Sequence, residues 1–237
     1  MWAIPQDDGI VFNVLVTAVP SGRGRLGPLI LCRLNRWKRA GKLANRRQKA
    51  TSFLQKMSQN PTTGAVILNG GRALRMGTEK AVMQLGQSTL IRYSYALAEE
   101  LALPCHEQTK DDRPGLGPLG GIETALRRAK CLGHQRELFL SCDMPFLQPS
   151  LLKQLLALKG PAVFASAHGR VGFPFCLGPE VLPEVSAQLN AGERSLQALA
   201  RRLQANLLSV PEEDWSQLDN LNTPADVEAA RVRLQSG

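Results

Sequence analysis

The chain has 237 residues, 43% hydrophobic and 21% charged, which is typical of a globular protein and excludes a fibrous or wholly disordered one. Its formal charge of +9 lies in the first 56 residues, while the rest carries equal numbers of acidic and basic side chains. A charge-balanced body argues against a nucleic-acid-binding face. The five cysteines include no C-x-x-C pair, which favours a reduced, cytoplasmic chain over a disulfide scaffold or a zinc site.

Residues 1–56 are predicted to form a basic, poorly ordered arm that precedes the main domain. Within this arm, residues 10–19 are apolar, but they follow no basic segment and are too short to cross a bilayer, so neither a signal peptide nor a membrane span is expected. Residues 22–27 match G-x-G-x-x-G. No second strand is expected after Pro28, and no acidic residue follows before Glu79, which argues against dinucleotide binding.

The basic stretch 33–49 has two interpretations, a helix that touches RNA or anionic lipid, or a solvated tail. The neutral body favours the tail. Met57 opens a short polar lead before the first strand expected in the main domain, residues 57–237. We therefore hypothesise that translation starts at Met57, and a native protein with the mass of the full chain would contradict this.

The main domain begins with an apolar, branched run at residues 64–68, which predicts a buried parallel strand that enters a glycine loop. Strand and helix patterns then alternate, which predicts an α/β fold with a mostly parallel open sheet and helices on both faces. The further strands are expected at 137–142, 161–167 and 174–177, and the helices at 88–103, 119–130, 149–158, 180–189, 194–204 and 224–235.

The strongest motif is LNGGRALRMGTEK, residues 68–80, directly after the first strand. Its glycines allow backbone N–H groups to point into one concavity and hold phosphate oxygens, and Arg75 and Lys80 add positive charge. The motif differs from a Walker A loop because Gly77 is followed by Thr78. Without further motifs, a plain glycine turn with two surface bases would be an equally good interpretation.

This loop resembles the signature L-A-G-G-x-x-x-R-M-G-x-x-K of nucleotidyltransferases, in particular the molybdenum cofactor guanylyltransferases, the MobA family. Three more motifs follow in the family's order: DDRPGLGPLGGI at 111–122, LFLSCDMPF at 138–146 and NLNTP at 220–224. Together they cover nearly the whole main domain, whereas the arm has no counterpart. The resemblance implies a Rossmann-like nucleotidyltransferase fold, and the G-P-L form favours the guanylyl branch over the related cytidylyltransferases.

The resemblance implies that GMP is transferred from GTP to the terminal phosphate of molybdopterin, with release of pyrophosphate. It implies that Asp143 binds Mg²⁺, because a hard cation held by a carboxylate and phosphate oxygens suits this chemistry. Asp143 could otherwise simply cap a turn. Asn220 and Asn222 would lie near the metal or the pterin phosphate, or act as turn asparagines before a helix that starts with proline.

The nucleotide-binding residues implied by the resemblance lie in the first two motifs. Lys80 and Arg75 would offset the triphosphate charge, and Asp111 would contact the nucleoside, with Asp112 as the alternative. Backbone groups of the glycine loop would hold the nucleotide, and these belong to Leu68, Asn69, Gly70 and Gly71. Cys142 is interpreted as strand core, and the three histidines, His106, His134 and His168, as surface residues.

The sequence departs from the family between the first long helix and Asp111, where only PCHEQTK, residues 104–110, fills the space. A central strand and a nucleoside contact are therefore expected to be shortened or missing. Asn69 also stands where the family usually has alanine. These departures allow an alternative function, a non-catalytic paralogue that binds nucleotide or a molybdoenzyme-maturation protein. A nucleic-acid-binding role of the arm is a third, less favoured hypothesis.

Overall fold

The computed structural model describes residues 2–4, 12–21, 25–32, 63–69 and 80–236, in two compact units, Met1–Ala50 and Thr51–Gly237. In the first unit, β1 (Trp2–Ile4), β2 (Phe12–Ser21) and β3 (Arg25–Cys32) form an antiparallel sheet. The expectation that Pro28 and the stretch after it give no second strand is wrong, since Pro28 lies within β3, which pairs with β2. A strand in place of the required helix further excludes dinucleotide binding here. Met57 and the basic stretch 33–49 lie outside the described residues.

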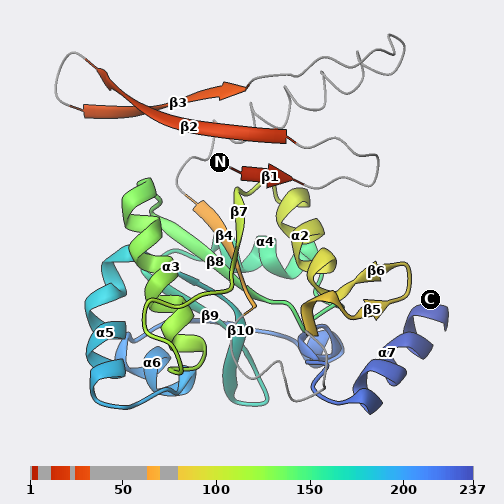
Figure 1. Ribbon diagram of the computed structural model, residues 1–237. Helices are drawn as coiled ribbons and strands as arrows, with labels where there is room; N and C mark the ends of the chain where they lie inside the picture. The colour runs from red at the N-terminus through yellow and green to blue at the C-terminus, as the bar shows by residue number, and fades with distance from the viewer. Residues whose placement is uncertain (1, 5–11, 22–24, 33–62, 70–79, 237) are drawn as a thin grey trace, which may run out of the picture. The chain divides into compact units, whose positions relative to one another are not determined.

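The second unit contains a six-stranded sheet in the order β11-β9-β10-β8-β4-β7 (Figure 1). Its strands are β4 (Thr63–Leu68), β7 (Cys105–Gln108), β8 (Arg136–Ser141), β9 (Ala162–Ala167), β10 (Arg170–Leu177) and β11 (Asn206–Ser209). β4 is parallel to β7 and β8, and β11 is parallel to β9, whereas β10 runs antiparallel to both neighbours. The predicted α/β fold with a mostly parallel sheet is confirmed.

β7 corrects the expectation of a missing strand. This strand is present, although it has only four residues, and it pairs in parallel register with β4 from Ala65–Cys105 to Leu68–Gln108. It also lies at the edge of the sheet and not in its interior. A short strand at the edge leaves no gap between the interior strands of the sheet.

Helices cover both faces of the sheet. These helices are α2 (Leu90–Glu100), α3 (Pro118–Leu132), α4 (Pro149–Ala157), α5 (Leu182–Asn190), α6 (Leu196–Arg202) and α7 (Pro224–Ser236). The predicted start of the first helix at residue 88 is wrong, because Ser88 and Thr89 form β6, which pairs with β5 (Gln84–Leu85) before α2 begins. Among the described residues, no helix is long and apolar enough to cross a membrane.

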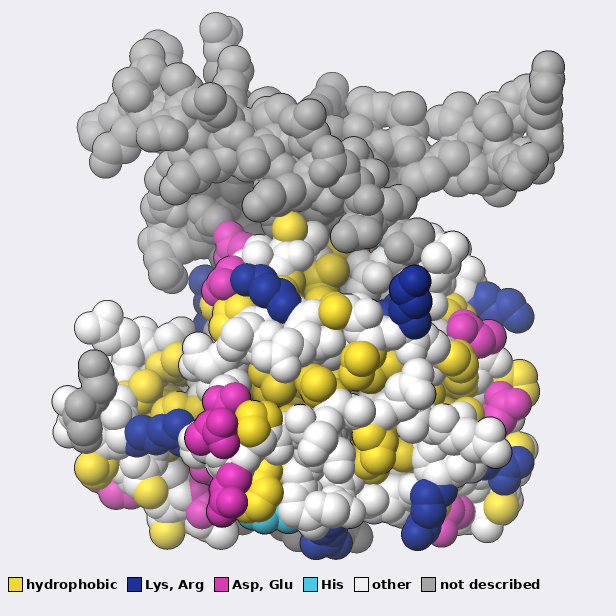
Figure 2. Space-filling model, turned by 180° about the vertical axis from the view of Figure 1, so that it is seen from behind, with side chains coloured by type: hydrophobic (Ala, Val, Ile, Leu, Met, Phe, Trp, Pro, Cys, Tyr) yellow, Lys and Arg dark blue, Asp and Glu magenta, His cyan; other side chains and the backbone are white. Residues whose placement is uncertain are grey.

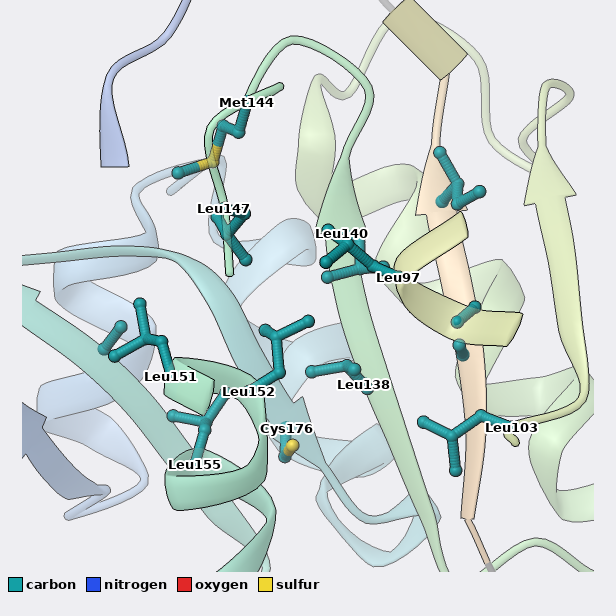
Figure 3. Packing of buried hydrophobic residues seen from close by; sticks show 14 of the residues in the cluster. Leu97, Leu103, Leu138, Leu140, Met144, Leu147, Leu151, Leu152, Leu155 and Cys176 are labelled. Carbon is teal, nitrogen blue, oxygen red and sulfur yellow. The ribbon is translucent and has the colours of Figure 1, made fainter. Parts of the chain in front are cut away.

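Successive side chains of β4 point to opposite faces of the sheet, as in any β-strand, and therefore pack in two different cores. Ala65 and Ile67 pack with α2 and α4, and this core is shown in Figure 3. Val66 and Leu68 pack on the opposite face with α3, α5 and α6. Because β4 is buried on both faces, it presents a nearly continuous apolar sequence, which explains why the sequence pattern identified it as a buried strand.

A third, smaller cluster fastens the C-terminal helix to the loop after β8. Its buried members are Leu85, Leu90, Phe146, Leu221, Val227 and Ala230. The cluster combines residues of β5, α2, the segment after β8 and α7, so it holds together segments that are far apart in the sequence. On the face of the molecule shown in Figure 2, basic and acidic side chains are interspersed, in keeping with the balanced charge of the main domain.

Candidate active site

The carboxyl ends of β7, β4 and β8 lie side by side, because the three strands are parallel neighbours. Leu68, the last residue of β4, pairs with Gln108 on one side and Ser141 on the other. Open α/β sheets bind ligands at this edge. Leu68 and Asn69, which begin the motif at 68–80, therefore lie beside the motif at 138–146, where the sequence predicted a nucleotide site.

Asn69 links all three strand ends. Its backbone N–H donates to the carbonyl of Gln108 at 3.1 Å, and its side-chain Nδ2 donates to Glu107 Oε1 at 2.5 Å. The thiol of Cys142 lies 3.6 Å from Asn69 Oδ1. An alanine could make only the backbone bond, so in this chain the unusual asparagine ties the start of the glycine loop to β7 and to the segment that precedes Asp143.

The glycine loop itself is not described. Gly70, Gly71 and Arg75 lie outside the described residues, and of Lys80 only the backbone is described, where it begins the 3-10 helix η2 (Lys80–Val82). Ala81, the next residue, is 1% exposed and packs in the core that contains α2. The end of the loop is thus anchored in the core. The roles predicted for Gly70, Gly71, Arg75 and Lys80 stay predictions.

Asp111 lies against the first turns of α3. A Cβ atom on Gly120 would be 3.2 Å from Asp111 Oδ2, and one on Gly121 would be 3.2 Å from Asp111 Oδ1 and 3.3 Å from Leu68 Cδ2. Glycine at these positions allows the carboxylate to approach the helix and to lie next to the end of β4. Burial, and to a smaller extent Asp112, raises the pKa of Asp111.

Asp112 has a different environment from Asp111. Its exposed carboxylate forms an ion pair with Arg127 at 3.0 Å, and its backbone N–H donates to Thr124 Oγ1 at 2.9 Å. Both partners belong to α3. Of the two aspartates that the sequence left open, Asp111 is the one that lies beside the end of β4, and Asp112 binds the surface of the helix.

Asp143 follows β8 by two residues. Its Oδ1 accepts a hydrogen bond from the Ser141 hydroxyl, and its backbone carbonyl accepts one from the N–H of Leu221 at 2.9 Å. The second bond joins the C-D-M-P and N-L-N-T-P motifs, which are almost 80 residues apart in the sequence. Leu221 is 3% exposed and anchors this contact in the third cluster, a role that the sequence analysis missed.

Asn220 and Asn222 flank Leu221, and both side chains are exposed. The N–H groups of Asn222 and Thr223 donate to Asp226 Oδ2 at 2.7 and 2.8 Å, and Thr223 Oγ1 accepts from the N–H of Asp226 at 3.2 Å. This reciprocal arrangement is a capping box that starts α7. The backbone around Asn222 therefore has a structural role, and the segment also carries both asparagines to the vicinity of Asp143.

The residues at this edge fit a magnesium ion held largely by a nucleotide. Asp143 offers a half-buried carboxylate at the end of a strand. Within the described ranges, no cluster of three or more His, Cys, Asp or Glu side chains could hold a metal. Mg²⁺ is commonly bound through one or two carboxylates together with substrate phosphates and water, so a single carboxylate suits it.

The histidines take no part in the site. The interpretation of His106 as a surface residue is wrong, because it is 6% exposed in β7, and burial, followed by nearby Arg128, lowers its pKa to about 4. His134 contacts Glu137 at 2.6 Å near the beginning of β8, away from the carboxyl ends of the strands. Cys142 is buried, as predicted.

The strand order, the glycine-rich sequence that follows β4 and the carboxylate after β8 are together typical of an α/β nucleotidyltransferase domain. A family model described as the MobA-like NTP transferase domain matches residues 65–207, so the chain belongs to this family. The resemblance seen in the four sequence motifs is thereby confirmed.

Curated relatives support the same assignment. The chain is 34% identical over 186 residues to a molybdenum cofactor guanylyltransferase of Ectopseudomonas mendocina, which covers 70% of this chain and 90% of the relative. It is 32% identical over 187 residues to the molybdenum cofactor guanylyltransferase of Rhodobacter capsulatus, covering 72% and 95%.

Solved structures share the fold. The molybdopterin-guanine dinucleotide biosynthesis protein A of Archaeoglobus fulgidus superposes with a TM-score of 0.56 at 21% identity, covering 74% of this chain and all of that chain. The 2-C-methyl-D-erythritol 4-phosphate cytidylyltransferase of Thermus thermophilus gives 0.52 at 14% identity, covering 73% and 99%. At these identities the similarity shows the α/β fold alone.

Proposed function

We propose that this protein transfers GMP from GTP to the terminal phosphate of molybdopterin and releases pyrophosphate, in a reaction that requires Mg²⁺. The proposal is supported by the names and nearly complete coverage of the curated relatives. The structural observation that carries it is the contact of Leu221 with the carbonyl of Asp143, which unites the last two family motifs at the end of β8.

The chemistry is an in-line displacement at the α-phosphorus of GTP. An oxygen of the acceptor phosphate forms the new bond, the bond from the α-phosphorus to the bridging oxygen breaks, and pyrophosphate leaves with the electron pair. Such a reaction depends on positioning and charge neutralisation and needs no protein nucleophile. This agrees with the described end of the sheet, where the thiol of Cys142 is buried and lies 3.6 Å from the amide oxygen Oδ1 of Asn69.

Each residue has a proposed part in binding the nucleotide. Backbone groups from Leu68 to Gly71 hold the nucleotide, and Lys80 and Arg75 neutralise the triphosphate. Asp111 accepts hydrogen bonds from the nucleoside, since its carboxylate lies beside the end of β4. Asp143 would hold Mg²⁺, which when bound neutralises phosphate charge. Asn220 and Asn222 then lie on the side from which the pterin phosphate approaches.

The non-catalytic alternative loses its main support because β7 is present and the side chain of Asn69 contacts Glu107 and Cys142 at the strand ends. We propose that the enzyme acts in the cytoplasm on free nucleotide and cofactor, and that any contact with molybdoenzyme-maturation proteins is secondary. A nucleic-acid partner is not proposed, because the main domain has no net charge.

The first test is a calorimetric titration of the full chain with GTP and with CTP, each with and without Mg²⁺. We expect GTP to bind selectively and Mg²⁺ to strengthen binding. Asp143→Ala should remove the Mg²⁺ dependence and weaken GTP binding by about tenfold or more, because the nucleotide-bound cation loses its protein ligand.

The control is Glu228→Ala, which removes an exposed carboxylate that pairs with Arg231 on α7. This variant should bind GTP like the wild type. Equal binding of CTP would contradict guanylyl specificity, and the absence of any nucleotide binding by the folded protein would favour the non-catalytic paralogue. Conversion of molybdopterin to its guanine dinucleotide by the same preparation completes the test.

A further inference from the structure

Glu123 is a carboxylate buried in the interior of α3. Its side chain is 0% exposed, and its neighbours on the helix, Ile122, Ala125 and Leu126, belong to the apolar core beneath the sheet. A buried carboxylate is costly unless charged or polar groups compensate it. Glu123 lies outside the four sequence motifs, so its partners are used to infer what it does.

Three polar side chains converge on one oxygen of Glu123. Arg127 Nη2 lies 2.8 Å from Oε1, the Ser186 hydroxyl donates to Oε1 at 2.6 Å, and Arg113 Nη1 is 3.6 Å away. Ser186 belongs to α5, Arg127 to α3 and Arg113 to the segment that leads into α3. Glu123 therefore joins α3 to α5 through its short contacts with Arg127 and Ser186, which are stronger than hydrogen bonds between neutral groups. It joins the segment before α3 through a longer ion pair with Arg113.

The network extends to the residue after Asp111. Arg127, held by Glu123, also pairs through Nη1 with Asp112 Oδ2 at 3.0 Å. Arg113 contacts Glu123 directly. The two residues that follow Asp111 are thus both connected to Glu123, one through Arg127 and one directly. The carboxylate of Asp111 packs closely against Gly120 and Gly121. Small movements of the segment 111–113 would therefore change the position of this carboxylate.

We propose that Glu123 is a positioning residue that holds Asp111 in place for the nucleotide, acting through Arg113 and Arg127. This inference rests on the proposed nucleotidyl transfer only in assigning the ligand. The proposed attachment of the segment 111–113 to α3 does not depend on which ligand binds there. It predicts that loss of the charge on Glu123 weakens GTP binding and leaves the interaction with the acceptor unchanged, since Asn220 and Asn222 are held by a different cluster.

The test uses Glu123→Gln in the full chain, which keeps the shape of the side chain and removes its charge. Steady-state guanylyl transfer with molybdopterin as acceptor should show a KM for GTP that is about fivefold to twentyfold higher, with the KM for molybdopterin and kcat nearly unchanged. Hydrogen exchange of residues 110–117 should become about tenfold faster. Glu123→Asp should restore part of the loss.

Two further variants provide a second test of the proposal and a control for it. Arg113→Gln changes a partly exposed partner, so it tests the same link if Glu123→Gln does not fold. Glu228→Gln is the matched control, since it removes an exposed carboxylate paired with Arg231 and should change none of these quantities. If both Michaelis constants rise in parallel with a loss of thermal stability, Glu123 is only a structural residue and the proposal is overturned.

The experiments distinguish a failure of the proposed guanylyltransferase function from a failure of the proposed positioning role of Glu123. If wild-type protein does not bind GTP, the guanylyltransferase assignment fails, and the exchange measurement still tests the positioning. If exchange of residues 110–117 is unchanged in Glu123→Gln and Arg113→Gln, the positioning is overturned, even when the wild type is an active guanylyltransferase.

Discussion

Two rims of the site are held by different forces. The rim that carries Asp111 is attached to α3 by a charged network centred on Glu123. The rim that carries Asn220 and Asn222 is attached through Leu221, which inserts into an apolar cluster. Charged contacts depend on direction and on protonation, whereas apolar contacts depend on volume. The comparison teaches that the two rims should respond to different substitutions.

The apolar rim also has one cation at its border. Arg233 of α7 stacks over the ring of Phe146 at 3.9 Å, and its Nη1 donates to the carbonyl of Ser216 at 3.1 Å. The segment before Asn220 is thus fixed to the loop after β8 from outside, while Leu221 fixes it from inside. Exposed cation–π contacts contribute about 0.5–1 kcal/mol, so the buried leucine dominates the attachment.

The largest expected effect is that of Leu221→Ala. Removing a buried leucine side chain should lower the free energy of unfolding by about 2–5 kcal/mol, because it loses apolar contacts and leaves a cavity in the third cluster. Urea unfolding at neutral pH measures the change.

The same variant should loosen the bond from the Leu221 N–H to Asp143 and raise the KM for molybdopterin more than the KM for GTP. Leu207→Ala, which truncates a leucine that is 53% exposed on β11, is the control and should alter neither quantity. A rise in the KM for GTP alone would break the distinction between the rims.

Gly121→Ala should act on the other rim. The added Cβ would lie 3.2 Å from Asp111 Oδ1 and 3.3 Å from Leu68 Cδ2, so Asp111 must shift. We expect GTP affinity to fall about tenfold and the free energy of unfolding to fall by no more than about 2 kcal/mol, because overpacking costs about 1–3 kcal/mol and alanine in a helix recovers about 1 kcal/mol. Calorimetry with GTP and urea unfolding measure the two effects.

A matched glycine substitution is available in β10, outside the residues assigned to the site, where an added Cβ meets no crowding. Gly172 in β10 has no atom within 4 Å of an added Cβ and does not adopt a positive φ. Gly172→Ala should therefore bind GTP like the wild type. Unchanged GTP affinity in Gly121→Ala would show that the position of Asp111 is unimportant for nucleotide binding.

The smallest expected effect is the pH dependence produced by Asp111. Burial raises its pKa in the folded protein, so the folded state binds this proton more tightly than the unfolded state does. Stability from this group is therefore highest in acid and decreases as the pH rises from the ordinary aspartate range through the raised pKa. Asp111→Asn removes this loss.

The asparagine variant should have a slightly higher Tm than the wild type at neutral pH, and the difference should shrink or reverse below the ordinary aspartate pKa, as thermal unfolding across pH 3–7 would show. It should nevertheless bind GTP more weakly, because it loses a charged acceptor. A Tm difference that grows toward acid pH would have the wrong sign and would contradict the burial of Asp111.

Much of the fold follows from sequence patterns with a simple physical origin. β4 and β8 are apolar because both of their faces are buried, so the runs at 64–68 and 137–142 identified them correctly. β7 was missed because Cys105–Gln108 reads C-H-E-Q, with few residues that favour a strand. Its existence depends on backbone pairing with β4, and the alternate burial of His106 and Gln108 is visible only in the folded structure.

The candidate site was predictable only in part. The motif spacing placed Asp143 and Leu68 at strand ends, and the structure brings these positions together. The environment of Asp111 depends on two glycines several residues away, so local sequence could not separate it from Asp112. The structural role of Leu221 could not be predicted from the local sequence, because a leucine between two asparagines has no reactive group. Its role depends on residues distant in the sequence that pack against it.

The contact between Asn69 and Cys142 has a consequence for how the protein is made. These residues are 73 positions apart, and the bond from Leu221 to Asp143 involves the last strand–helix connection of the chain. A nascent chain therefore cannot close the substrate edge of the sheet until nearly all of the domain has left the ribosome. Contacts between such distant segments form slowly, so ligand binding should appear at the end of folding and can serve as the marker of its completion.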